Sequence, residues 1–180
     1  RVFRSANFLW RGNSHLDETC LRLAQSPGCG KLDRLRLSRR RQQTGDRLQS
    51  PGIAALAKAD FSRLAELDLS YQDIGSGKLK ILLRSSALGG LKSLDLSGNP
   101  LKDTGAKALA RSGLLANLDV LKLESCQLTD AGLTVLAHAP DCRVEQLFLG
   151  GPENVFTPLG LRALLESPAA VHLRTPCLAC

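Results

Sequence analysis

A seven-residue segment, Leu-x-x-Leu-x-Leu-x, recurs along the chain at nearly constant spacing. Its clearest copies begin at residues 64, 91 and 118, and two further copies begin at 32 and 144, the last with valine first. The successive steps are therefore 32, 27, 27 and 26 residues. A period of this size indicates a stack of similar supersecondary units that bury their apolar sides against each other. We therefore expect function to lie on a broad surface.

Each repeat has two halves with different apolar periods. In the first half apolar and polar residues alternate, as in Leu67-Asp68-Leu69, which predicts a short strand with one buried face. In the second half apolar residues stand three and four positions apart, which predicts an amphipathic helix. Such helices are expected over 50–57, 76–83, 103–110, 130–137 and 158–165. Asp103 and Asp130 begin two of them and are expected to act as N-caps.

A glycine near the start of each predicted helix is expected to let the first turn approach the neighbouring repeat, because glycine has no Cβ. These glycines stand at 52, 77, 105, 132 and 160. A strand and a helix alternating in one direction predict a parallel sheet with helices on one side. Strands lie about 4.8 Å apart and packed helices about 8–10 Å apart. The sheet is therefore expected on the inside of an arc.

Residues 91–101 read Leu-Lys-Ser-Leu-Asp-Leu-Ser-Gly-Asn-Pro-Leu, and this pattern resembles the leucine-rich repeat. The helical half and the period are similar to the ribonuclease-inhibitor-like subclass, which includes the sensor regions of NOD-like receptors and the Ran GTPase-activating protein. The resemblance covers residues 32–168. It implies an α/β fold, a right-handed leucine-rich-repeat solenoid or horseshoe, with the parallel sheet on the concave face and helices on the convex face. It also implies a protein-binding module without catalysis.

In this family an Asn or Cys after the strand bonds to the backbone of neighbouring repeats. Asn13, Asn99 and Cys126 match this position, and Cys126 is accordingly expected to be a buried structural thiol. The equivalent position is expected at Arg40, Gln72 and Pro152 in the other repeats, where the pattern departs from the family.

The chain 1–180 is expected to be a single leucine-rich-repeat domain with five clear repeats over 32–168. Residues 1–31 are expected to form a degenerate first repeat, with Phe8 and Trp10 in place of the strand leucines. The absence of methionine, even at position 1, is typical of a fragment or a processed chain.

Residues 169–180 are expected to form a partial repeat or a C-terminal cap. Arg174 and Pro176 stand where leucines belong, which predicts a broken strand. An open sheet edge can pair with another chain, so self-association at the solenoid ends is a further expectation.

The polar strand positions are expected to form two columns on the concave face, and these are the predicted partner-binding residues. The first column is Arg34, Glu66, Ser93, Val120 and Gln146, and the second is Arg36, Asp68, Asp95, Lys122 and Phe148. Their character changes from basic through acidic and mixed to apolar. A rigid array of this kind costs little ordering on binding, and an aromatic anchor carries much interface energy. The sequence therefore predicts a protein partner.

The net charge of +7 is concentrated in residues 1–90, which hold 16 Lys/Arg against 8 Asp/Glu. The long first step places about five extra residues around 39–49, and this basic loop contains Arg39, Arg40 and Arg41. One alternative function is weak binding of an anionic ligand there, and another is regulation of a partner enzyme, as by a Ran-type GTPase activator. Nucleic-acid binding is disfavoured because no aromatic residues interleave with the basic ones.

No constellation for catalysis or for a cofactor is visible. The chain has no Ser-His-Asp arrangement, no H-E-x-x-H and no phosphate-binding loop, so we expect no enzyme activity. Of six cysteines only Cys177 and Cys180 have zinc-ligand spacing, without a second pair, so no metal is expected. The irregular spacing favours a reducing compartment, the cytoplasm. No apolar run reaches the roughly 20 residues of a membrane span.

Overall fold

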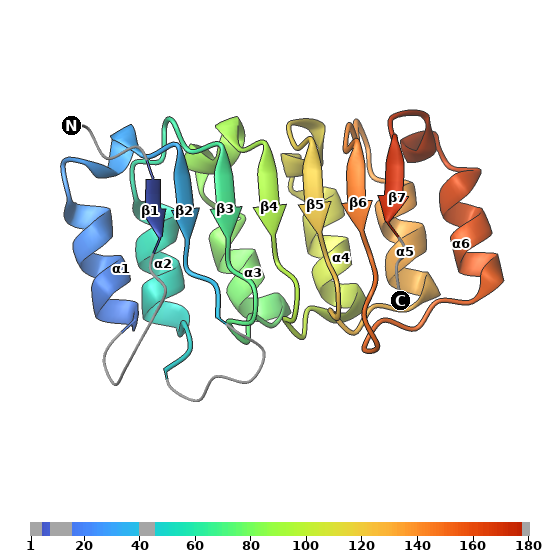
Figure 1. Cartoon of the computed structure of the whole chain (residues 1–180), viewed down its shortest axis with the longest axis horizontal. Coiled ribbons are helices and arrows are strands. Elements are labelled where there is room, and N and C mark those ends of the chain that lie inside the picture. Colours follow the sequence, from blue (N-terminus) through green and yellow to red (C-terminus); the bar gives the residue numbers. More distant parts are fainter. Residues whose placement is uncertain (1–4, 8–15, 40–45, 178–180) are drawn as a thin grey trace.

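The computed structural model describes residues 5–7, 16–39 and 46–177 of the chain. Over this part the backbone forms one parallel sheet whose seven strands follow one another in sequence order (Figure 1). The strands are β1 Ser5–Asn7, β2 Arg34–Arg36, β3 Glu66–Asp68, β4 Ser93–Asp95, β5 Val120–Lys122, β6 Gln146–Phe148 and β7 Thr175–Cys177. The predicted parallel sheet of short strands is confirmed.

The helices form a second layer, which lies behind the sheet in Figure 1. The α-helices are α1 Leu16–Gln25, α2 Ser50–Lys58, α3 Ser76–Leu82, α4 Lys102–Arg111, α5 Asp130–Ala137 and α6 Pro158–Leu165. The 3-10 helices are η1 Cys29–Lys31, η2 Ser86–Gly90, η3 Leu114–Ala116 and η4 Pro168–Val171. Each α-helix packs against the next one along the chain. The wider spacing that helices need places them on the convex side.

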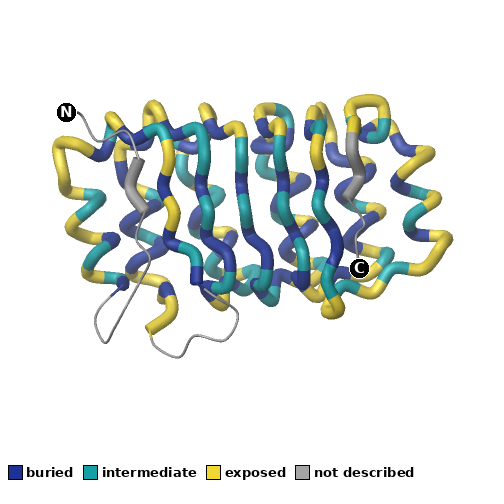
Figure 2. The backbone as a smooth tube through the Cα atoms, in the orientation of Figure 1, coloured by how far each residue is buried: buried dark blue, intermediate teal, exposed yellow. Residues whose placement is uncertain are grey.

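The core lies between these two layers and is built largely from leucine (Figure 2). The central leucine of each strand from β2 to β6 and the leucine two residues later are buried, because alternate strand side chains point to the same face. They are Leu35, Leu37, Leu67, Leu69, Leu94, Leu96, Leu121, Leu123, Leu147 and Leu149. Full burial of one such side chain contributes about 1.5–3 kcal/mol to folding.

Asn99 ties neighbouring repeats together at the turn after β4. The side chain is fully buried, and its Oδ1 accepts hydrogen bonds from the N–H groups of Gln72 and Ile74 at 3.0 and 2.9 Å. Its Nδ2 donates to the carbonyl oxygens of Leu69 and Leu96 at 3.0 and 2.8 Å. One amide thus satisfies buried backbone groups that would cost about 1–3 kcal/mol each if unpaired. The predicted ladder position is confirmed at Asn99.

Gln72 links neighbouring repeats in the same way, although it departs from the Asn or Cys that the family pattern has at this position. Its Oε1 accepts from the N–H of Leu48 at 3.1 Å, and its Nε2 donates to the carbonyl of Leu37. The longer side chain still presents an amide at the right place. Gln72 is therefore a member of the ladder.

Asn154 fills the ladder position of the repeat that begins with β6, so the assignment to Pro152 is wrong. Its Oδ1 accepts from the N–H of Cys126 at 2.9 Å, and its Nδ2 donates to the carbonyl of Leu149 at 2.8 Å. Asn154 stands five residues after that leucine, whereas Asn99 stands three after its counterpart Leu96. Two extra residues in the turn displace the amide along the sequence.

Cys126 is fully buried and its thiol donates to the carbonyl of Leu96 at 3.3 Å, which confirms the expected structural thiol. A thiol offers no amide oxygen to the preceding repeat. The N–H of Leu101 donates to the carbonyl of Asn99 in its own turn at 2.7 Å, and the N–H of Lys102 donates to the backbone carbonyl of Cys126 at 3.0 Å.

The predicted N-cap aspartates act on the helix of the following repeat. Asp103 Oδ1 accepts from the N–H groups of Thr129 and Gly132 at 2.9 and 3.0 Å, at the start of α5. The cap of α5 itself is Thr129, whose hydroxyl accepts from Ala131, so the prediction of Asp130 as its own helix's cap is wrong. Asp130 bonds the N–H of Thr157 before α6 at 2.8 Å in the same way.

The glycines of the helix starts have different surroundings. A Cβ on Gly132 would lie 2.4 Å from Asp103 Oδ1, and Cβ atoms at 52 and 160 would lie 2.3 and 2.0 Å from aspartate oxygens of the preceding repeat, which confirms their packing role. A Cβ on Gly105 would meet Leu101 of its own repeat at 2.7 Å and Leu79 of the preceding repeat only at 3.6 Å. A Cβ on Gly77 would meet nothing within 4 Å, so that prediction is wrong. Aligned with α4, Gly77 corresponds to Thr104, and Lys78 stands at the glycine position.

The two ends of the sheet follow a longer step than the central repeats. Ala6 of β1 lies opposite Leu35, so the prediction that places Phe8 there is wrong. Phe8, Trp10 and Asn13 themselves lie outside the described residues. Pro176 of β7 lies opposite Leu147, so the strand is formed rather than broken. Proline fits here because an edge strand pairs on one side only in this sheet.

Candidate functional site

The open face of the sheet, called here the concave face, carries the two predicted columns. Register pairing aligns the residues before the central leucines, which are Arg34, Glu66, Ser93, Val120 and Gln146. It aligns the residues after these leucines as Arg36, Asp68, Asp95, Lys122 and Phe148. All ten alternate with buried leucines and therefore project from the face opposite the core. Their placement agrees with the sequence, and their role in binding stays a prediction.

The basic end of the concave face lies on β2. Arg34 Nε and Glu66 Oε1 of the next strand form an ion pair at 3.1 Å. Arg36 is exposed and forms no ion pair with a residue that the structure describes. The first column thus begins with a cation that is ion-paired, and the second with a cation that is exposed.

Two aspartates occupy the centre of the face. Asp68 Oδ1 accepts from the N–H and the hydroxyl of Ser70 at 3.0 and 2.8 Å, and Asp95 Oδ1 accepts from the N–H of Ser97 at 2.9 Å. Burial raises the pKa of Asp95 above its usual value, and the charge of Asp68 raises it further. The Ser97 hydrogen bonds and the charge of Lys122 lower this pKa.

The far end of the face combines a cation with apolar surface. Lys122 Nζ lies 3.8 Å from Asp95 Oδ2 and 5.4 Å from the centre of the Phe148 ring. The ring face attracts the ammonium group electrostatically. Phe148 and Val120 are both half-buried on the face and offer apolar surface beside a charge. This combination is typical of protein interfaces.

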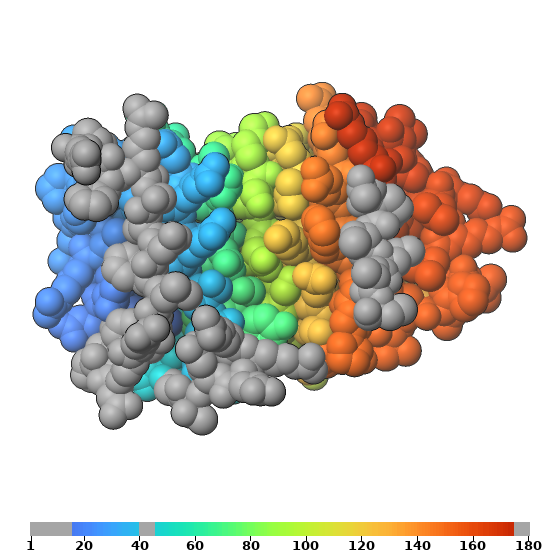
Figure 3. Space-filling view, viewed as in Figure 1, coloured from blue at the N-terminus to red at the C-terminus, as the bar shows by residue number. Residues whose placement is uncertain are grey.

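A shallow hollow of about 240 Å³ lies in the middle of the concave face. The residues that line it come from β2, β3, β4 and β5 and are Arg36, Glu66, Leu67, Asp68, Ser93, Asp95 and Lys122. Figure 3 shows the strands of this face toward the viewer, between the blue and the orange ends of the chain. The hollow therefore joins residues of both columns into one surface.

A third row of polar groups follows the two columns and was not predicted. Ser70, Ser97 and Glu124 stand two residues beyond the second column, and the hydroxyl of Ser97 accepts from the N–H of Glu124 at 3.3 Å. In the sequence, each member of this row is the polar residue that directly follows the second buried leucine of the repeat. These serines hold the aspartates in place rather than reaching outward.

The basic loop differs from its prediction at Arg39. Arg39 is only 8% exposed, and its backbone N–H donates to the backbone carbonyl of Ser70 at 3.1 Å. Arg39 thus continues the parallel pairing beyond β2 and does not belong to the inserted loop. Arg40 and Arg41 lie outside the described residues.

In the described part of the chain, no three His, Cys, Asp or Glu side chains lie close enough together to hold a metal ion. Cys20, Cys29, Cys126 and Cys142 are free thiols there. Burial raises the pKa of Cys20 and of Cys126 to about 12, which keeps both thiols protonated and unreactive. The side chains of Cys177 and Cys180 lie outside the described residues.

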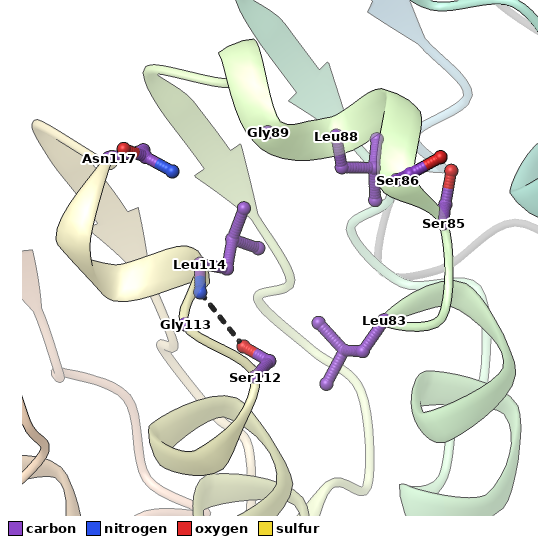
Figure 4. A pocket seen from close by; sticks show the side chains of 9 residues that line it. All are labelled: Leu83, Ser85, Ser86, Leu88, Gly89, Ser112, Gly113, Leu114 and Asn117. Atoms are coloured by element: carbon purple, nitrogen blue, oxygen red, sulfur yellow. Dashed lines mark hydrogen bonds between the residues drawn. The ribbon is translucent and has the colours of Figure 1, made fainter.

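A second hollow of about 240 Å³ lies beside the 3-10 helices η2 and η3 (Figure 4). Leu83, Leu88 and Leu114 line it together with serine, glycine and asparagine residues, and Ser112 Oγ accepts from the N–H of Leu114 at 3.2 Å. Its lining carries no charged side chain. This hollow therefore offers a partner no charged group, unlike the hollow on the concave face.

The comparisons with known proteins agree with the fold. A model of the leucine-rich repeat family matches residues 91–110 and 115–137, which cover β4 with α4 up to its last residue and β5 with α5. No curated protein matches the chain in sequence. In the described residues no helix is long and apolar enough to cross a membrane. The same strand and helix unit continues on both sides of the matched segments, and the described residues therefore have the fold of a leucine-rich-repeat solenoid.

Proposed function

We propose that this chain is a non-catalytic protein-interaction module that binds its partner through the concave face. Leucine-rich repeats generally mediate protein–protein interaction. The observation that carries the proposal is the set of ten polar and apolar side chains held in register on the open face of the sheet. Because the ladder amides and buried leucines fix the backbone, a partner meets a surface that needs little ordering.

We further propose membership of the ribonuclease-inhibitor-like subclass. Full helical turns in every repeat and central steps of 26 and 27 residues support this assignment. We propose the repeats over 32–168 as the complete units, with 1–31 and 169–180 as the flanking parts. The four free thiols of the described residues favour a reducing compartment, and we propose the cytoplasm.

Self-association is a second proposal, and the open edge at β7 supports it. Leu159, Leu165 and Val171 near this end are 76%, 57% and 82% exposed. A concentration series in sedimentation velocity tests it, with a rising sedimentation coefficient expected. A constant monomer value up to the highest concentration would contradict it.

The test of the main proposal is affinity capture from native lysate with the wild type and the Asp95→Arg/Phe148→Asp variant, at low and high salt. A matched control, Lys107→Asp/Glu166→Arg, makes similar changes at exposed positions of the helical layer. We expect partners that survive high salt, bind the control and are lost with the concave variant. Partners that bind all three proteins equally would contradict the proposal, provided circular dichroism shows the variants folded.

A further inference from the structure

The concave face presents three zones in a fixed order along the sheet. Arg36 on β2 is an available cation, the carboxylates of Asp68 and Asp95 lie on β3 and β4, and Phe148 on β6 is apolar. The spacing between these zones is set by the strands, about 4.8 Å for each step. A ligand that crosses the strands therefore meets the zones one after another.

The central carboxylates keep acceptor capacity for a partner. Each aspartate uses Oδ1 for the serine two residues later. Asp68 Oδ2 accepts no hydrogen bond from the described part of the chain, and Asp95 Oδ2 has Lys122 Nζ only at 3.8 Å, longer than a hydrogen bond. Burial also disfavours the charged form of Asp95, as its raised pKa indicates. A cation placed between these oxygens would relieve that cost.

The hollow gives such a cation room. Ser93 stands in the first column between Glu66 and Val120 and lines the same hollow as the two aspartates, where its short side chain occupies little space. Glu66, Asp68 and Asp95 all line this hollow. A guanidinium group is planar and presents paired donors that match carboxylate oxygens, whereas an ammonium group is a point charge.

We propose that the concave face binds an extended segment of a partner protein that places an arginine in the hollow, an acidic residue on Arg36 and an apolar residue on Phe148. This inference rests on the proposed function and names the partner's chemistry. Charge complementarity selects the first two side chains, and the half-buried aromatic ring selects the third. Lys122 borders the hollow and sets the limit of the acidic zone.

The strand spacing converts this order into a sequence pattern. The hollow between β3 and β4 lies about 7 Å from the β2 position and about 12 Å from the β6 position. An extended segment advances about 3.3 Å per residue and presents the same side every second residue. The acidic residue therefore stands two positions to one side of the arginine, and the apolar residue four positions to the other side.

The test is selection of a phage-displayed library of random twelve-residue peptides on the wild-type protein. Clones that lose binding to Phe148→Asp define the concave-face binders. We expect arginine in these clones, with Asp or Glu two residues to one side and a large apolar residue four residues to the other. Synthetic fluorescein-labelled peptides from this set should bind Asp68→Asn/Asp95→Asn at least tenfold more weakly. The asparagines keep an oxygen for Ser70 and Ser97, so the fold is preserved.

Two comparisons make the result decisive. Glu166→Gln removes an exposed carboxylate on the helical layer and should leave the affinity within twofold. Asp68→Arg should prefer the peptide whose arginine is replaced by glutamate. Concave-face binders without arginine, or with unchanged affinity for the double asparagine variant, overturn this inference and leave the proposed function standing. A selection in which no binder is sensitive to Phe148→Asp contradicts the proposed function itself.

Discussion

Replacing Asn99 tests the claim that buried amides hold the repeats in register. Asn99→Ala removes the oxygen that accepts from Gln72 and Ile74 and the nitrogen that donates to Leu69 and Leu96. The two N–H groups that lose their acceptor cost about 1–3 kcal/mol each. The truncation also leaves a cavity in the core. We expect the free energy of unfolding to fall by about 3–5 kcal/mol, a large share of the 5–15 kcal/mol typical of a domain.

The assay is urea unfolding followed by circular dichroism. With a slope of about 2 kcal/mol per molar urea, the midpoint should fall by about 2 M. Asn99→Asp has nearly the same size but loses the Nδ2 donor, so a similar fall separates hydrogen bonding from volume. Asn117→Ala makes the same truncation at an exposed site and should change stability by less than about 0.5 kcal/mol. A loss below about 1 kcal/mol for Asn99→Ala would refute the reasoning.

Three further predictions concern single sites. Gly77→Ala should stabilise the protein by about 0.5–1 kcal/mol, because a Cβ at this helical position would meet no other atom. Gly132→Ala should destabilise it, and thermal unfolding that ranks the two variants in the opposite order would contradict the packing role. Native Cys126 should resist iodoacetamide at pH 8 because burial raises its pKa to about 12, as mass spectrometry would reveal. The Asp95 carboxyl should titrate by NMR above the usual aspartate pKa, and Lys122→Met should raise that pKa further by removing the cation that lowers it; a decrease would contradict the assignment.

The raised pKa of Asp95 also has a definite sign for stability. The charged carboxylate is disfavoured in the folded protein, so this group lowers stability at pH values above its folded pKa. The penalty diminishes as the pH falls through that value and is absent below the usual aspartate pKa. Asp130 behaves oppositely, because hydrogen bonds from Thr157 lower its pKa. Its contribution is present above the usual aspartate pKa and is lost as the pH falls through the lower pKa of the folded protein.

The repeat period allowed the fold and the concave columns to be predicted from sequence. Leucine alternation is a local signal, and once each strand is located the register across the sheet follows, as at Asp68 and Asp95. The period could not locate Asn154, because two extra residues in its turn shift the amide away from Pro152. It could not place β1, whose step to β2 differs from the central repeats.

Side-chain partners were beyond the sequence for a different reason. The repeat aligns Arg34 with Glu66 and Lys122 with Phe148, but only packing decides which of these pairs make contact. Arg39 was assigned to a solvated loop because charge usually indicates exposure. Its backbone instead continues the sheet, which draws the side chain into a buried position.

The most direct test of the account is NMR mapping of the bound state. Backbone amide shifts of the labelled protein would be followed while a partner captured by the wild type is added. The account predicts changes concentrated on β2 to β6 and the turns that follow these strands, with α3, α4 and α5 little affected on their outer sides. Changes centred on the outer sides of these helices, with the strand amides unmoved, would contradict concave-face recognition.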